Sequence, residues 1–303
     1  MSSTRTGLVF VCLAGILWGT GGLALEILRD RSPMSVLTVS AHRMLVAAVV
    51  LLAASLVLRK GPHLAALVRA HPARAVAVGL GTGAYQALYF GSVATAGVTV
   101  ATVVSLGVAP VLLAVVDVVR ARHRAVTHGT VRLTLVVGAA LAGLVLVSAA
   151  SGSGAGGTRP VLGLLLAAAS GSVYALTTTL GSTVLASGGA DPLAFTTVAT
   201  TAGAVGLVPV ALAGGGPFLT GDPTALVTLG YLGVFTMALA YGLFYAGLRT
   251  TRSGAAVIAT LLEPVTAAVA AAVVLGERLG PGGVVGTVLV LAAVAGLDER
   301  GDG

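Results

Sequence analysis

The stretch Leu261-Leu262-Glu263-Pro264-Val265-Thr266 lies inside a continuous apolar segment that starts near Ser253 and ends near Leu275. A helix of this length can cross the hydrocarbon core of a bilayer, which takes roughly 20 residues. Glu263 and Pro264 fall near its middle, far from either water interface. A carboxylate at that depth is costly, so such groups usually face a bundle interior or an aqueous cavity. We therefore expect Glu263 on the wall of a polar cavity. The alternative is a kinked helix whose carboxylate only bonds a neighbouring helix.

Pro264 predicts a break in this helix. Proline has no backbone N–H, so the carbonyl of Thr260 loses its helical partner and the helix bends there. A carbonyl freed in this way beside the Glu263 carboxylate would be able to bind a ligand or an ion.

Apolar residues dominate the rest of the chain as well. Of its 303 residues, 56% are hydrophobic and 9% are charged, whereas a soluble domain carries about 25% charged residues. Such a chain cannot cover a surface that faces water, which indicates an all-α polytopic membrane protein. The net charge of +7 might suit nucleic acid. However, the basic residues are spread among the loops and form no patch mixed with aromatic residues, so we expect no nucleic-acid partner.

Breaks marked by polar residues, Gly or Pro divide the chain into ten expected transmembrane helices. Their approximate ranges are 7–25, 35–58, 74–95, 98–119, 130–149, 160–186, 192–213, 224–247, 253–275 and 281–297. With the N-terminus in the cytoplasm, the cytoplasmic segments hold twelve Lys or Arg residues and the outer segments hold four. This bias predicts a multi-pass protein of the cell (inner) membrane with both termini in the cytoplasm.

The chain divides into two similar halves, 1–150 and 158–303, on either side of a Gly/Ser-rich stretch at 151–157 whose composition is typical of a flexible linker. With an offset of 154 residues, Pro110 aligns with Pro264 and Phe90 with Phe244. A unit of five spans crosses the membrane an odd number of times, so its second copy must enter inverted. Inverted repeats with interrupted helices at matching positions are typical of secondary transporters. We therefore expect two inverted five-helix repeats around a central cavity, with helix breaks at Pro110 and Pro264.

Glycines recur at four-residue spacing, which lets neighbouring helices approach closely. The pairs are Gly15/Gly19, Gly79/Gly83 and Gly282/Gly286. We interpret them as helix-packing positions rather than as parts of a binding site.

Several short motifs resemble those of one known family. They are Leu262-Glu263-Pro264 with the later Gly276-Glu277-Arg278-Leu279, then Leu17-Trp18-Gly19-Thr20, and His42-Arg43-Met44 with Ala47. Together they cover both halves and resemble EamA-type proteins of the drug/metabolite transporter superfamily. The resemblance implies ten helices in two inverted repeats and transport of small metabolites or drugs, often outward. The family's Gly-Glu after the fourth span is absent here, where His123 stands, and its role would then fall to Asp117.

Polar and aromatic residues within the expected spans are the candidates for substrate binding. Arg43 would be costly unpaired, so it is either an anion clamp or partner of Glu263, or a structural ion pair or carbonyl cap. Trp18 lies inside the membrane rather than at an interface, and its indole N–H needs a partner. The expected substrate-binding set is Trp18, Arg43, Tyr85, Gln86, Tyr89, Tyr174, Tyr241, Tyr245 and Glu263. A cavity of this kind suits amino acids, aromatic metabolites or amphiphilic drugs.

These patterns predict a secondary transporter that alternates access and is coupled to protons through Glu263, and the family resemblance implies that it is an exporter. An uncoupled exchanger or uniporter would need no such proton, and a non-transporting scaffold subunit would need no buried polar residues. Only His42 among the five histidines lies within a span, and no residues have metal-ligand spacing, so we expect neither an enzyme nor a metal or other cofactor. The expected partners are a small-molecule substrate and the lipid bilayer. The solute, the direction of flux and a homodimeric state are left open.

Overall fold

Helices make up all the regular structure in the computed structural model, which describes residues 3–121, 128–150, 159–186, 190–274 and 280–298. They are α1 (Ser3–Arg31), α2 (Val36–Val57), α3 (Gly61–Ala70), α4 (Pro72–Ala96), α5 (Val98–Ala121), α6 (His128–Ala150), α7 (Pro160–Ala186), α8 (Pro192–Ala213), α9 (Pro223–Gly233), the π-helix η1 (Val234–Leu239), α10 (Ala240–Leu248), α11 (Ser253–Ala259), α12 (Leu262–Val274) and α13 (Pro281–Asp298). The expected linker at 151–157 and the residues His123, Glu277 and Arg278 lie outside these ranges. The Asp117 side chain is likewise not described.

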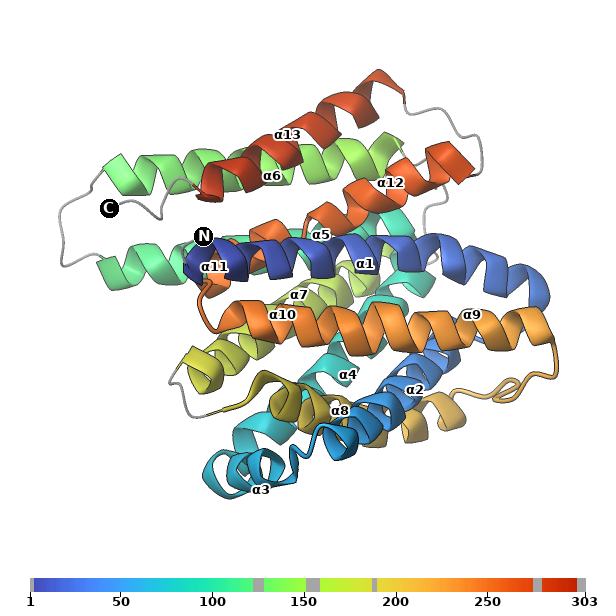
Figure 1. Ribbon diagram of the computed structural model, residues 1–303. Helices are drawn as coiled ribbons and strands as arrows, with labels where there is room; N and C mark the ends of the chain where they lie inside the picture. Colours follow the sequence, from blue (N-terminus) through green and yellow to red (C-terminus); the bar gives the residue numbers. More distant parts are fainter. Residues whose placement is uncertain (1–2, 122–127, 151–158, 187–189, 275–279, 299–303) are drawn as a thin grey trace.

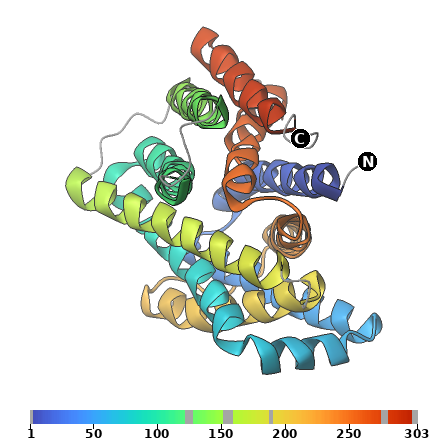
Figure 2. The same cartoon turned by 90° about the vertical axis from the view of Figure 1, so that its left-hand side faces the viewer.

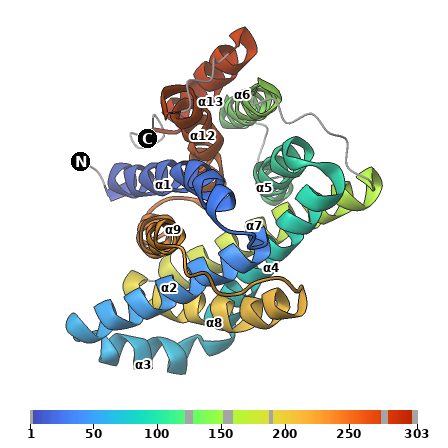
Figure 3. The ribbon, with the colours of Figure 1, turned by 90° about the vertical axis from the view of Figure 1, so that its right-hand side faces the viewer.

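The helices form one bundle with two distinct edges. The pair α6 and α13 packs side by side at the top of Figure 1, and α2, α3 and α8 lie at the bottom. Figures 2 and 3, turned by 90°, show the same pair and the same group at opposite edges. Helix α1 and the continuous α9–η1–α10 rod run between them, next to α7 and α4.

Six helical segments in the described part of the chain are long and apolar enough to cross a bilayer. They cover Thr4–Arg31, Val36–Val57, Pro160–Ala186, Pro192–Ala213, Pro223–Leu248 and Ser253–Val274. Shorter apolar helices cover Val100–Val116, Thr134–Ala149 and Pro281–Gly296. Helix α4 occupies the expected span 74–95 but belongs to neither group. The chain is thus an all-helical, multi-pass membrane protein, and the count of ten spans stays a prediction.

Two local features were not expected from the sequence. The short helix α3 occupies the loop after α2, where Leu67 is buried and the His63 and Arg69 side chains are exposed. The π-helix η1 interrupts the eighth expected span. A π-turn adds one residue to a helical turn and commonly marks functional sites.

The helix is interrupted near only one of the two aligned prolines. A break separates α11 from α12 at Thr260 and Leu261, next to Pro264. Helix α5, in contrast, runs through Pro110 without interruption, so the predicted break at Pro110 is wrong. One missing hydrogen bond is tolerated there because α5 packs closely along α7, where Ser105 Oγ donates to the Ala167 carbonyl at 3.2 Å.

Two of the three glycine pairs pack closely against other helices, and the third pair does so with one glycine only. Gly79 and Gly83 of α4 face α8, and Gly15 and Gly19 of α1 face the α11–α12 break. Gly286 packs against Gly143 of α6, whereas a Cβ at Gly282 would meet open space within 4 Å. Gly282 is therefore not a packing position, because it lies on the exposed first turn of α13.

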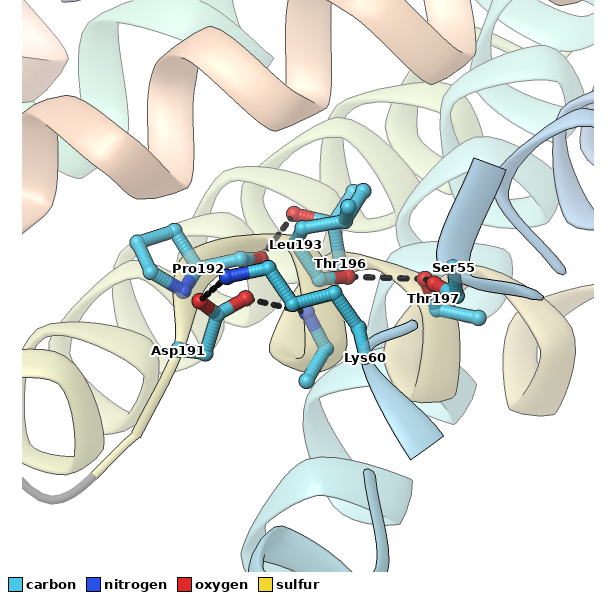
Figure 4. Close-up of polar contacts among 8 residues, drawn as sticks. Ser55, Lys60, Asp191, Pro192, Leu193, Thr196 and Thr197 are labelled. Atoms are coloured by element: carbon cyan, nitrogen blue, oxygen red, sulfur yellow. Dashed lines mark hydrogen bonds and ion pairs between the residues drawn. The ribbon is translucent and has the colours of Figure 1, made fainter. Parts of the chain in front are cut away.

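A polar cluster joins the end of α2 to the start of α8 (Figure 4). Lys60 Nζ donates to Asp191 Oδ2 at 2.7 Å, and Asp191 Oδ1 accepts the Ala194 N–H at 3.1 Å. Asp191 is thus both the N-cap of α8 and an ion-pair partner. Burial by itself would raise the pKa of Asp191, but the bonds from Lys60 and Ala194 outweigh it and hold that pKa below its ordinary value.

We expect Asp191→Asn to lower thermal stability slightly at neutral pH. Asn can still cap the helix, so only the ion pair is lost, which contributes up to about 1 kcal/mol. A folded-state pKa below the ordinary value of about 3.9 means that the carboxylate stabilises the fold above that pH. The contribution is lost as pH falls through the folded pKa.

Melting curves in detergent at pH 7 and at about pH 3 test this. The wild-type protein should melt above the variant at neutral pH, and the difference should shrink in acid. Asp222→Asn, which alters the N-cap of α9 without a described ion pair, is the matched control and should show little change. An equal difference for Asp191→Asn at both pH values would contradict the assignment.

Candidate functional site

The site contains a carboxylate at the start of α12. Glu263 follows the α11–α12 break, and its backbone N–H donates to the Thr260 carbonyl at 2.9 Å. The Thr260 carbonyl is therefore already a hydrogen-bond acceptor, and the expectation of a freed carbonyl is wrong: a tight turn replaces the partner that Pro264 cannot supply. The break still has a consequence, because it directs the Glu263 side chain out of the helix stack and into a cavity.

The central cavity consists of two adjoining compartments. One has a volume of about 170 Å³ and the other about 260 Å³. Both are lined by Trp18, Gly22, Tyr85, Tyr89, Leu106 and Glu263. The first compartment extends to Arg43 of α2 and Tyr241 of α10, and the second to Ser148 of α6 and Pro264. Helices from both halves of the chain thus enclose one space.

Arg43 contributes a cationic group to the first compartment. Its Nη2 donates to Thr236 Oγ1 at 3.0 Å, and Thr236 Oγ1 donates to the Leu232 carbonyl at 2.6 Å. Thr236 belongs to η1, so the π-turn presents the acceptor for the guanidinium. The Arg43 Nε is buried without a hydrogen-bond partner among the described residues. Arg43 therefore keeps an unused donor beside the cavity.

Arg43 and Glu263 line the same compartment without forming an ion pair with each other in the described structure. Their side chains line one wall each of that space and are not within ion-pair distance of each other. Of the readings that the sequence left open for Arg43, the geometry shows neither an ion pair with Glu263 nor a carbonyl cap. It shows a cation and an anion on the walls of one space.

Aromatic rings form much of the remaining wall. The Trp18 ring lies 4.9 Å from that of Tyr241 between centroids, and the Tyr85 ring lies 5.4 Å from that of Tyr174. Trp18 Nε1 is buried and finds no hydrogen-bond partner among the described residues. Tyr89 Oη lies 2.9 Å from Thr102 Oγ1. The tyrosine rings thus pack on other aromatic rings of the wall, and the Tyr89 hydroxyl has a threonine partner.

Most of the expected substrate-binding residues come together here. Trp18, Arg43, Tyr85, Gln86, Tyr89, Tyr174, Tyr241 and Glu263 all line the first compartment. Tyr245 does not: its buried ring packs on Phe195 and Phe244 below the cavity. Gln86 lines the wall while its Nε2 donates to Met44 Sδ at 3.3 Å, a weak acceptor.

Several residues around the cavity were missed from the sequence. Thr236 accepts a hydrogen bond from Arg43. The Thr260 hydroxyl lies 3.0 Å from the Tyr174 hydroxyl. Phe244 contacts the rings of Trp18, Tyr174 and Tyr241. Threonines in apolar helices usually bond their own backbone, so their presence alone did not mark them. Phe244 was noted only as the counterpart of Phe90.

Known proteins share both the sequence pattern and the fold of this chain. The EamA-like transporter family matches residues 5–149 and 161–297. A Bacillus subtilis (strain 168) protein named uncharacterized transporter YwfM is 28% identical over 208 residues, which cover 68% of this chain and 67% of that one. A crystal structure described only as that of a protein aligns with a TM-score of 0.75 at 18% identity, over 96% of both chains, and shows a shared fold. The chain therefore belongs to the EamA-like transporter family and is a membrane transporter.

Proposed function

We propose that the protein is a secondary transporter that exports a small solute by alternating access, with Glu263 exchanging the coupling proton. The observation that carries this proposal is the central cavity. It holds a cation, an anion and several aromatic rings from both halves of the chain, and the two charges do not neutralise each other directly. Unpaired intramembrane charges are costly and mark solute or ion pathways.

Helix contacts support two inverted repeats, 1–150 and 158–303. With the 154-residue offset, α1 corresponds to α7, α2 to α8, α4 to α9–α10, α5 to α11–α12, and α6 to α13. Helix α1 packs on α10 and α12, and its counterpart α7 packs on α4 and α5. Likewise α2 packs on α9 and α8 packs on α4, while α2 with α8 and α6 with α13 pair across the halves. The contacts are thus exchanged when the halves are exchanged, as a two-fold relation requires.

Contacts between loops are consistent with the expected topology. Lys60 pairs with Asp191, and the Ser182 and Ser253 hydroxyls lie 2.8 Å apart. Lys60 and Asp191 belong to loops expected in the cytoplasm, and Ser182 and Ser253 lie at the cytoplasmic ends of the expected spans 160–186 and 253–275. The Arg159 N–H donates to the Thr95 carbonyl at 3.1 Å, and both belong to segments expected outside. By this assignment the central cavity lies in the outer half of the bundle, and both termini are cytoplasmic.

The cavity favours a solute that carries both a carboxylate and an ammonium group on an apolar or aromatic body. Arg43 would bind the carboxylate and Glu263 the ammonium, since charged hydrogen bonds are among the strongest available. The rings of Trp18, Tyr85 and Tyr241 would contact the body of the solute. Amino acids have this chemistry. Uncharged aromatic metabolites would use only the rings, and cationic drugs only the rings and Glu263.

Counterflow of labelled solute into proteoliposomes tests the function. Solutes are first chosen by thermal-shift screening of the purified protein against amino acids, nucleobases and cationic drugs. We expect Arg43→Gln to raise the KM for carboxylate-bearing solutes by about tenfold or more, since a hydrogen bond to a charged group contributes roughly 1.5–3 kcal/mol.

Arg29→Gln, at the exposed end of α1, is the matched control and should transport normally. Absence of counterflow for every solute that stabilises the wild-type protein would contradict transport by this chain. An unchanged KM in Arg43→Gln would contradict the assigned carboxylate site.

A further inference from the structure

A second, larger cavity lies at the opposite end of the bundle from the central cavity. Its volume is about 640 Å³, and it is lined by the second half of α5, the second half of α7 and the α10–α11 turn. We call it the α7 crevice and define it by Leu113, Leu176, Thr179, Arg249 and Arg252. The crevice is distinct from the central cavity, because the two share no lining residue.

The α7 crevice is the counterpart of the central cavity in the other half of the chain. Adding 154 to five of the residues that line the central cavity gives residues that line the crevice. The pairs are Trp18/Ser172, Gly21/Ala175, Gly22/Leu176, Leu25/Thr179 and Val98/Arg252, and in the reverse direction Ala267/Leu113. A two-fold relation that inverts the second half turns an opening on one side of the membrane into an equivalent opening on the other.

A tightly packed layer lies along α10 between Tyr241, which lines the central cavity, and Leu248, which lines the crevice. Tyr174, Phe244 and Tyr245 are buried, and the Phe244 ring contacts both tyrosine rings. The void that they enclose with Thr82 and Thr178 measures about 10 Å³, which is barely the space that one water molecule needs. The Tyr174 hydroxyl also contacts Thr260, 3.0 Å away, just before Glu263. Displacing this layer would connect the crevice with the central cavity.

The charges of the α7 crevice differ from those of its counterpart. Arg249 and Arg252 are exposed at its rim, and no described carboxylate lines it. Arg252 takes the place that Val98 has in the other half. Its wall combines apolar side chains with the hydroxyls of Ser172, Thr179 and Ser182. A positive rim attracts anions and raises their local concentration.

We propose that the α7 crevice is the vestibule through which the solute passes between the Arg249 side of the membrane and the central cavity, and that Arg249 and Arg252 attract its anionic group. This rests on the proposed function, since a vestibule presupposes a transported solute. The crevice is filled with water and reached from the Arg249 side, while the aromatic layer around Tyr174 is the barrier that must open.

Site-directed thiol labelling tests the proposal without any transport assay. Cys12 is the one cysteine of the chain, so Cys12→Ser provides a background without thiols. Thr179→Cys places a thiol in the crevice, and Leu176→Cys is a second position in case the first variant does not fold. Leu165→Cys, on an exposed apolar face of the same helix, is the matched control. The probes are anionic and cationic methanethiosulfonates of similar size and membrane-permeant N-ethylmaleimide.

We expect the crevice thiol to react with both charged probes applied from the Arg249 side, and about fivefold faster with the anionic one, since two arginines lie nearby. The double substitution Arg249→Gln with Arg252→Gln should bring the two rates together. The thiol at 165 should react with neither charged probe. In transport, Arg252→Gln should raise the KM for carboxylate-bearing solutes added on the Arg249 side and leave the KM from the opposite side unchanged.

The outcomes separate this proposal from the proposed function. Reaction of the crevice thiol with N-ethylmaleimide alone would mean that lipid chains fill the crevice and would overturn the vestibule. Equal rates for both charged probes in the presence of the arginines would overturn their role. If labelling follows the expected pattern but no solute shows counterflow, the proposed function fails while the anion-attracting, water-filled crevice stands.

Discussion

Glu263→Gln is expected to abolish accumulation of solute driven by a pH gradient while retaining exchange of solute for solute at a raised KM, because the glutamine oxygen still accepts a hydrogen bond from the solute ammonium but carries no charge. Glutamine keeps the size and hydrogen-bonding capacity of the side chain but cannot exchange a proton. One pH unit corresponds to about 1.4 kcal/mol, so one exchanged proton can support at most about tenfold accumulation per unit. The wild-type protein should approach this ratio, and the variant should give a ratio of about one.

Proteoliposomes loaded at one pH and diluted into another provide the measurement, with counterflow at equal pH as the companion assay. Glu26→Gln, which removes an exposed carboxylate at the far end of α1, is the matched control and should accumulate normally. Accumulation by wild-type protein that is indifferent to the pH gradient would reject proton coupling and leave the uncoupled exchanger or uniporter. Loss of accumulation and counterflow in Glu263→Gln, even at high solute concentration, would assign Glu263 to solute binding alone and contradict its separate role in proton exchange.

Gly79→Ala is expected to destabilise the protein strongly. A Cβ at residue 79 would overlap the Ala199 carbonyl oxygen and lie 2.9 Å from the Ala199 carbonyl carbon and from the Ala202 Cβ. These atoms belong to the backbone and short side chains of α8, which cannot rotate away. Overpacking typically costs about 1–3 kcal/mol, so we expect the melting temperature to fall by roughly 5 °C or more.

Gly138→Ala is the matched control, because a Cβ at residue 138 of α6 would meet nothing within 4 Å. It should leave the melting temperature within about 1 °C or raise it, since Ala favours helix over Gly. Thermal melting of both variants in the same detergent gives the comparison. An undisturbed Gly79→Ala protein would contradict the close approach of α4 and α8, and with it the contact between the two halves.

Most of the residues around the cavity could be predicted from the sequence, because a polar side chain in a membrane helix is stable only where it avoids the lipid. Glu263, Arg43 and Trp18 stand out in apolar segments, and a polar group that cannot face lipid must face the interior. Eight of the nine expected substrate-binding residues line one compartment for this reason. Tyr245 is the exception, because a tyrosine can also be buried by packing, as its ring is against Phe195. Whether the eight bind a solute stays a prediction.

The tertiary structure alone decided which partners these residues have. Pro110 and Pro264 align, yet only the second stands next to a break, because neighbouring contacts of α5 offset the missing hydrogen bond. Likewise, Gly282 and Gly286 form one pair in the sequence, but only Gly286 packs against another helix, at Gly143 of α6.

By itself, the sequence determined the membrane class, the position of the break near Pro264 and the residues that had to turn inward, because these follow from the cost of polar groups in lipid. The tertiary structure decided that Arg43 is held by Thr236 of a π-helix and faces Glu263 without pairing with it. It also decided that Arg249 and Arg252 lie together at a second crevice, between α5, α7 and the α10–α11 turn. Apolar periodicity reports burial but not the neighbour, and only the packing of distant helices supplies that.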